Sequence, residues 1–174
     1  MEEFPRKDSA LYDMLRGSQE AKRKSLRNWK QMNKIVVFLY ELGLLPLLGI
    51  GHYILLLYTV GRISGKPRVN PLEYRRRGDT ILLFSARGKS SDWYRNLKAN
   101  PEKTEIRIGF KRIKPAVQFI DDPANVEEIM RWYIQKFPGS SKMLFGWDQK
   151  KDNLETADLS SLAEALKIVQ LTPE

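Results

Sequence analysis

Cysteine is absent from the 174-residue sequence, and histidine occurs only once, as His52. Without thiols the chain cannot form disulfides, thiolate metal sites or a cysteine nucleophile. One histidine cannot supply a multi-histidine metal site, and a Ser-His-Asp triad would depend on His52 alone. We therefore expect no metal centre and no hydrolase triad.

Long hydrophobic runs are also missing. The most apolar stretch, residues 35–51, is interrupted by Glu41, Pro46 and three glycines, whereas a membrane-spanning helix needs about 20 consecutive apolar residues. No signal-peptide pattern follows the start of the sequence. We expect a cytoplasmic protein, for which peripheral contact with the inner face of the membrane remains an open alternative.

Acidic residues are scarce in the middle of the chain. The net charge is +9, and residues 61–115 carry fifteen Lys or Arg against five acidic residues. A positive field concentrated in one segment indicates an anionic partner, such as phosphates, nucleic acid or lipid headgroups.

Hydrophobic periodicity predicts an α+β fold. Residues 1–17 are mixed and polar, as in a flexible tail, and residues 18–174 have the length of one domain. A basic amphipathic helix is expected over 18–45, because Leu26, Trp29, Met32 and Val36 recur at helical spacing. This helix either packs on its own domain or also touches an anionic membrane surface.

The remaining elements alternate between strands and short helices. About six strands are expected, over residues 53–60, 68–77, 80–85, 104–110, 113–120 and 167–171, with Pro71 indicating an edge or a bulge. Helices should follow Ser91 and Asp122 and cover residues 158–165, with a stop at 138–141 and an irregular segment over 142–155. Hairpin connections between the strands favour an antiparallel barrel with flanking helices.

Two glycine-containing basic loops follow strands. Residues 61–71 read GRISGKPRVNP and residues 86–91 read ARGKSS, the second just before a helix start. Free backbone N–H groups beside cations suit an anion, and so does a helix N-terminus. Simple solvated turns are the alternative interpretation, because short Gly/Lys motifs have many false positives.

Two longer motifs resemble the signatures of a known family. Residues 56–72 read LLYTVGRISGKPRVNPL, similar to L-T-T-x-G-R-x-S-G-x-x-R-x-x-P-L, and residues 93–101 read WYRNLKANP, similar to W-x-x-N-L-x-A-N-P. The family is the deazaflavin (F-420)-dependent nitroreductase group of the split β-barrel, flavin-reductase-like superfamily. Two long motifs in the right order are a specific signal.

The resemblance implies that the chain binds coenzyme F-420, an 8-hydroxy-5-deazaflavin with a phosphate and a polyglutamate tail. FMN is the alternative cofactor, since related split barrels bind flavin phosphates. The residues implied to hold the cofactor lie in the two loops and the helix that follows them: Arg62, Ser64, Lys66, Arg68, Pro71, Ser85, Ala86, Arg87, Gly88, Trp93, Asn96 and Asn100.

The implied chemistry is hydride transfer to a small-molecule acceptor, namely a quinone, an enone or a nitro compound. Tyr133 and Ser85 are the candidate proton donors, and Phe137, Phe145 and Trp147 the candidate pocket wall. The family's tyrosines are missing from residues 137–147, which favours a bulky apolar acceptor such as a quinone over a nitro compound.

Partners other than the cofactor and acceptor are expected only by weaker arguments. A nucleic-acid-binding module would fit the charge alone. Because the cations cluster at glycine breaks rather than along one helix, we expect no nucleic-acid partner. Split barrels often form homodimers, which is an analogy of fold.

Overall fold

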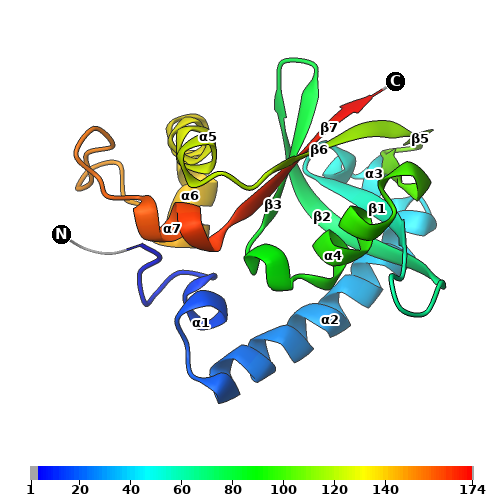
Figure 1. The fold of residues 1–174 in the computed structure, drawn as a ribbon, viewed down its shortest axis with the longest axis horizontal. Helices are drawn as coiled ribbons and strands as arrows, with labels where there is room; N and C mark the ends of the chain where they lie inside the picture. The colour runs from blue at the N-terminus through cyan, green and yellow to red at the C-terminus, as the bar shows by residue number, and fades with distance from the viewer. Residues whose placement is uncertain (1–3, 174) are drawn as a thin grey trace. The chain divides into compact units, whose positions relative to one another are not determined.

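The computed structural model describes residues 4–173, and these form two compact units (Figure 1). The first unit consists of the described residues in Met1–Arg27, Ala86–Gly88 and Ile120–Lys167, and the second takes the rest of the described chain. Each unit is therefore built from several separate segments of sequence. A single domain over residues 18–174 stays a prediction.

The second unit is built on a seven-stranded sheet with the order β5-β4-β1-β2-β3-β7-β6. Strand β1 pairs antiparallel with β2 and β4, and β2 pairs antiparallel with β3. The strands are β1 (Ile54–Val60), β2 (Pro67–Arg77), β3 (Thr80–Ser85), β4 (Glu105–Ile108), β5 (Lys111–Ile113), β6 (Pro115–Ile120) and β7 (Lys167–Pro173). The predicted α+β split antiparallel barrel is confirmed, with seven strands in place of six.

The additional strand is β5, which lies mostly in the connection between the strands predicted over 104–110 and 113–120, whereas β6 corresponds to the second of these. Strand β5 pairs with β4 at one end of the sheet, whereas β6 lies beside β7 at the other end. Only Lys114 separates the two strands, and β6 begins at Pro115, which has no N–H to donate to a ladder. The chain thus leaves one sheet edge and joins the opposite one, which is the connection expected of a curled sheet.

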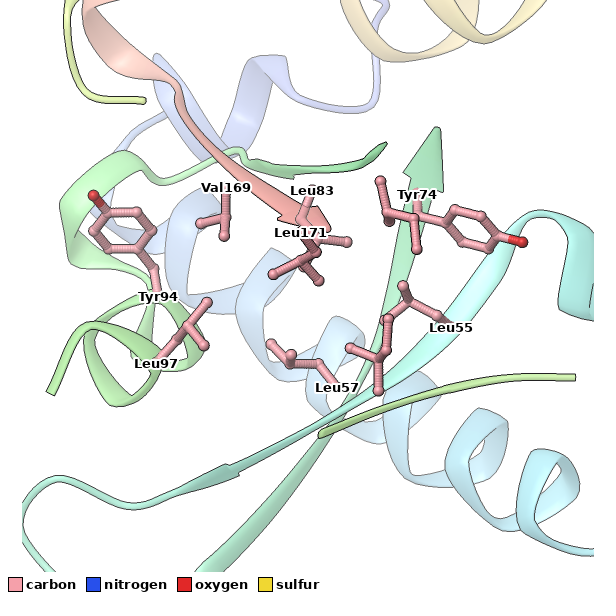
Figure 2. Close-up of a cluster of buried hydrophobic side chains, with 10 residues drawn as sticks. Leu55, Leu57, Tyr74, Leu83, Tyr94, Leu97, Val169 and Leu171 are labelled. Atoms are coloured by element: carbon pink, nitrogen blue, oxygen red, sulfur yellow. The ribbon is translucent and has the colours of Figure 1, made fainter. Parts of the chain in front are cut away.

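The core of the second unit lies on one face of this sheet (Figure 2). Leu55 and Leu57 share a face of β1 because side chains alternate along a strand. They meet residues from β3, β7 and the helix α4 (Asp92–Ala99), among them Leu83, Leu171 and Leu97. All five side chains are fully buried.

Proline 71 lies within β2, opposite Leu56 of β1. The prediction of an edge strand is wrong, because β2 is flanked by β1 and β3. The register between β2 and β3, however, covers only Tyr74 to Arg77. Pro71 thus lies ahead of that ladder, where its missing N–H costs no bond to β3.

The long helix α2 (Gln19–Glu41) agrees with the helix predicted over 18–45, and its residues from Asn28 onward belong to the second unit. Gly43, with φ 80°, follows its end. Short helical segments α3 (Leu44–Leu47) and η1 (Ile50–His52) then lead into β1, and η2 (Gly88–Ser90) and η3 (Pro101–Lys103) flank α4.

The first unit contains the helices α1 (Tyr12–Leu15), α5 (Pro123–Lys136), α6 (Pro138–Phe145) and α7 (Ser160–Ala165). Helix α5 begins as predicted, with the Asp122 side chain accepting a hydrogen bond from the Asn125 N–H at 3.1 Å. Helix α5 ends at Lys136, just before the predicted stop at 138–141, but the irregular segment expected over 142–155 is wrong in its first part, because α6 runs from Pro138 to Phe145. A proline both ends a preceding helix and is favoured at the first position of a following one, so Pro138 alone does not reveal α6.

Residues 4–17 differ from the predicted flexible tail, whose first three residues lie outside the described range. Phe4, Leu11 and Met14 are buried, and the backbone N–H of Arg6 donates to the Phe145 carbonyl at 3.0 Å. The Arg6 guanidinium also donates to both carboxylate oxygens of Asp152, at 2.9 and 2.6 Å. The three buried apolar residues are spread over eleven positions without helical or strand periodicity. The sequence pattern therefore did not predict that this segment is packed.

Candidate functional site

The first basic loop connects β1 to β2 as a hairpin in the second unit. Its ends are held by a hydrogen bond from the Gly61 N–H to the Lys66 carbonyl at 2.9 Å, and by one from the Gly65 N–H to the Gly61 carbonyl at 2.8 Å. Gly65 has φ +64°, a conformation that glycine adopts without steric cost. Ser64 lies inside the loop, and its Oγ accepts a hydrogen bond from the Lys66 N–H at 3.4 Å.

The loop is attached to α4 through Arg62. The Asn96 Oδ1 accepts hydrogen bonds from the Arg62 backbone N–H at 3.2 Å and from its guanidinium at 3.1 Å. The guanidinium also pairs with Asp92 at 3.2 Å. Helix α4 thus fixes both the main chain and the side chain of Arg62.

A groove of about 880 Å³ opens between this hairpin, the start of α4 and the second-unit part of α2. Its lining residues come from these elements and the start of β2: Lys30, Asn33, Lys34, Val37, Phe38, Glu41, Gly61, Arg62, Ile63, Ser64, Arg68, Val69, Asn70, Asp92 and Asn96. All of them belong to the second unit.

Helix α2 is held beside the sheet by Tyr40. The Tyr40 hydroxyl accepts a hydrogen bond from the Gly109 N–H at 2.7 Å and donates to the Arg107 carbonyl at 3.4 Å. Burial raises the pKa of the Tyr40 hydroxyl. This contact positions the helix that forms one wall of the groove.

Cations outnumber acids in the groove, four to two. Arg62 is paired with Asp92, but Lys30, Lys34 and Arg68 form no ion pair with any described residue. Unpaired cations that converge from a helix and a loop favour a ligand with several negative charges.

The groove brings together four of the residues predicted to hold the cofactor: Arg62, Ser64, Arg68 and Asn96. Lys66 is exposed on the same hairpin but is not part of the lining. Trp93 packs against the barrel core and lies 6.0 Å from Tyr94, ring centre to ring centre. Asn100 follows α4, and its N–H donates to the carbonyls of Asn96 and Leu97.

The second basic loop is divided between the units. Ser85, at the end of β3, is buried, and its hydroxyl is hydrogen-bonded to the Ser91 hydroxyl at 2.7 Å. Ala86, Arg87 and Gly88 belong to the first unit. Gly88 has φ +51°, and a Cβ there would approach the Ala165 carbonyl oxygen to 2.3 Å, so this position requires glycine for packing.

The other predicted residues belong to the first unit. Tyr133 is buried, with its ring 5.3 Å from that of Phe137 and 6.0 Å from that of Phe145. Trp147 is buried 5.3 Å from Phe4. These aromatic residues form part of a packed interior, and their roles in proton donation or substrate contact stay predictions.

Sequence reasoning missed Lys30 and Lys34. The signal was the set of polar residues at positions 30, 33, 34 and 41, which a helical period places on one face. That face could not be assigned to the loop at 61–68, because the two segments are separated by the residues of α3, η1 and β1.

Comparison with known proteins identifies the family of the chain. Residues 45–138 match the model of the family described as "F420H(2)-dependent quinone reductase". Relatives of that name from two Mycobacterium tuberculosis strains are 39% identical over 94 residues, covering 47% of this chain and 62% of theirs. The chain therefore spans less than two thirds of the length of these relatives.

A solved structure shows the same fold. A candidate 5-nitroimidazole antibiotic resistance protein from Bacteroides thetaiotaomicron superposes with a TM-score of 0.50 at 14% identity, covering 72% of this chain and 75% of the other. The family model spans more than half of the chain and includes the groove hairpin and α4. The chain belongs to the F420H(2)-dependent quinone reductase family.

Proposed function

We propose that this protein is an oxidoreductase that binds reduced coenzyme F-420 in the second-unit groove and transfers hydride to a quinone. The observation that carries the proposal is the groove itself, where Arg68 and two lysines have no ion-pair partner among the described residues. The family model covers the hairpin and α4. The family match and the cations of the groove therefore both support a polyanionic coenzyme as the ligand.

The residues present fit a polyanionic cofactor. Arg62 and Arg68 would hold its phosphate region, and the Ser64 hydroxyl supplies a neutral hydrogen-bonding group beside them. Asn96 keeps Arg62 in place, and Val37, Phe38 and Val69 give the groove an apolar portion. When bound, the coenzyme supplies the hydride donor, so the protein needs to orient the reactants and exclude water.

The reaction requires one proton in addition to the hydride. A quinone that accepts a hydride ion and a proton becomes a quinol, so a donor must lie near the acceptor oxygen. Ser85 is the proposed donor of the second unit. Tyr133 as a donor, and Phe137, Phe145 and Trp147 as apolar neighbours of the acceptor, stay predictions for the first unit. Ser85 also holds Ser91 through their hydroxyl bond.

A binding titration tests the proposed cofactor. Quenching of tryptophan fluorescence should saturate with F-420, and the Arg68→Gln variant should require at least about tenfold more coenzyme, as expected when one charge-assisted contact is lost. FMN is titrated in parallel. Saturation by FMN with no response to F-420 would refute the proposal in favour of a flavin enzyme.

We also propose that the acceptor is taken from a membrane surface by a protein on its cytoplasmic side. Leu47 and Leu48, at the end of α3, are 74% and 77% exposed. Phe38, in the last turn of α2, is 62% exposed, and basic residues precede it on that helix. Exposed apolar and basic residues together suit an anionic lipid surface. A homodimer that covers these residues is the alternative arrangement.

No described helix combines the length and the apolar character needed to cross a bilayer.

Vesicle flotation distinguishes these arrangements. The wild-type protein should float with anionic vesicles. The Leu47→Glu/Leu48→Glu variant should stay in the unbound fraction at the bottom of the gradient, because two exposed apolar side chains are lost. Gln31→Glu, on α2, adds a negative charge without removing apolar area and serves as the control. If wild type and the leucine variant float equally, the membrane proposal is wrong.

A further inference from the structure

The helix wall of the groove carries two lysines that the family motifs do not include. Lys30 and Lys34 both line the groove and are both exposed. Neither forms an ion pair with any described residue. They are four residues apart on α2, so they lie on the same face of the helix.

We propose that Lys30 and Lys34 bind successive carboxylates of the oligo-γ-glutamate tail of the coenzyme. The inference rests on the proposed function and names the part of the ligand that the helix wall recognises. Arg62 and Arg68 remain assigned to the phosphate region on the opposite, hairpin wall.

The spacing of the two lysines suits a γ-linked chain. Two residues four apart on an α-helix are separated by a rise of about 6 Å. An α-linked residue spans at most about 3.6 Å with three backbone atoms, so a γ-linked glutamate, with five, spans about 6 Å. Consecutive carboxylates of the tail thus repeat at the interval of the lysine pair.

The charges along the groove limit where such a tail can lie. The ionisable lining groups are Lys30, Lys34, Glu41, Arg62, Arg68 and Asp92. Glu41 lies two helical turns beyond Lys34 on α2 and repels a carboxylate there, and Asp92 already holds Arg62. The favourable positions on α2 are therefore those of the two lysines.

The test compares coenzyme forms that differ only in the tail. Binding of F-420 with several glutamates and of its tail-free phosphate precursor is measured by tryptophan fluorescence, at low and at raised salt. Wild type should bind the long-tailed form about threefold to tenfold more tightly, the range expected of two solvent-exposed ion pairs. Raised salt should reduce this advantage.

The Lys30→Ala/Lys34→Ala variant should lose this advantage and bind both forms as wild type binds the tail-free form. Alanine suits an exposed helical position, and circular dichroism verifies folding. Lys24→Ala, on the same helix but outside the groove lining, should keep the advantage. Equal wild-type affinity for both forms, or equal loss for both forms in the double variant, would overturn the tail assignment and leave the proposed function standing. Absence of binding of either form to wild type would overturn both.

Discussion

The Asn96 side chain accepts two hydrogen bonds from Arg62, one from its backbone and one from its guanidinium, through a single oxygen. Arg62 belongs to the first family motif and Asn96 to the second. The two motifs are thus joined in space by one residue pair, which sets the hairpin against α4. This pair explains why a polar residue is needed at a nearly buried position of that helix.

Replacing Asn96 should therefore impair the groove more than replacing Asp92. Asn96→Ala leaves the Arg62 N–H without its acceptor, at a cost of about 1–3 kcal/mol in unfolding free energy, and frees the guanidinium, so F-420 affinity should fall about tenfold. Asn96→Asp retains an acceptor oxygen, so its affinity for F-420 should be closer to that of the wild type than the affinity of Asn96→Ala is. Urea unfolding and fluorescence titration measure the two effects. Asp92→Asn removes an exposed pair, expected to contribute less than about 1 kcal/mol; a larger loss there than in Asn96→Ala would contradict this ranking.

Two glycines with similar backbone angles should respond differently to alanine. Gly65→Ala meets open space and should cost only the left-handed backbone conformation, about 1–2 kcal/mol. Gly88→Ala carries the same backbone cost and also brings a Cβ within 2.3 Å of a carbonyl oxygen. The melting temperature of Gly88→Ala should therefore fall further than that of Gly65→Ala. Equal losses in the two variants would show that the contact with Ala165 relaxes freely.

The Tyr40 hydroxyl should stabilise the second unit in a pH-dependent way. Tyr40→Phe leaves the Gly109 N–H without its acceptor and should lower the unfolding free energy by about 1–3 kcal/mol at neutral pH. The folded-state pKa is raised above the ordinary 10.0, so this stability is present below pH 10 and is lost as pH rises towards the folded value.

Urea unfolding between pH 7 and 11 measures this effect, and the wild type should lose more stability over that range than Tyr40→Phe. Tyr58→Phe is the matched control, because the Tyr58 hydroxyl is buried and has no hydrogen-bond partner among residues 4–173. A loss in Tyr58→Phe as large as in Tyr40→Phe would count against the hydrogen bond as the cause.

Residues 4–17 should contribute to the stability of the first unit. Arg6→Ala removes the paired bonds to Asp152 and a bond to the Gly146 carbonyl at 2.8 Å, and should cost about 1.5–3 kcal/mol. Lys7→Ala, at an exposed neighbouring position without an ion pair to any described residue, should change little. Thermal unfolding of the two variants compares them directly, and indistinguishable midpoints would restore the view of this segment as a tail.

Local patterns predicted most of the barrel. The hairpin turn at Gly78 and the alternation in β4 identify strands because a strand exposes and buries successive side chains. The Asp122–Pro123 pair predicted the start of α5, because aspartate is favoured at the N-cap and proline at the first helical position. Such features depend on neighbours within a few residues.

The failures concern arrangements that depend on distant contacts. The short strand β5 and the strand β6 pair with partners at opposite ends of the sheet, which no alternation over residues 111–120 reveals. The lysines of α2 belong to the groove only because Tyr40 holds that helix against the sheet. The burial of Tyr133 likewise follows from packing with α6, a helix that was not predicted.

The two walls of the groove differ in their relation to the family. The hairpin and α4 lie within residues 45–138, which the family model covers, whereas Lys30 and Lys34 lie before its first residue. The proposed tail site therefore depends on a helix segment that the matched part of the chain does not include. Exchanging residues 28–41 for another amphipathic helix would remove Lys30 and Lys34 while leaving the hairpin and α4 unchanged.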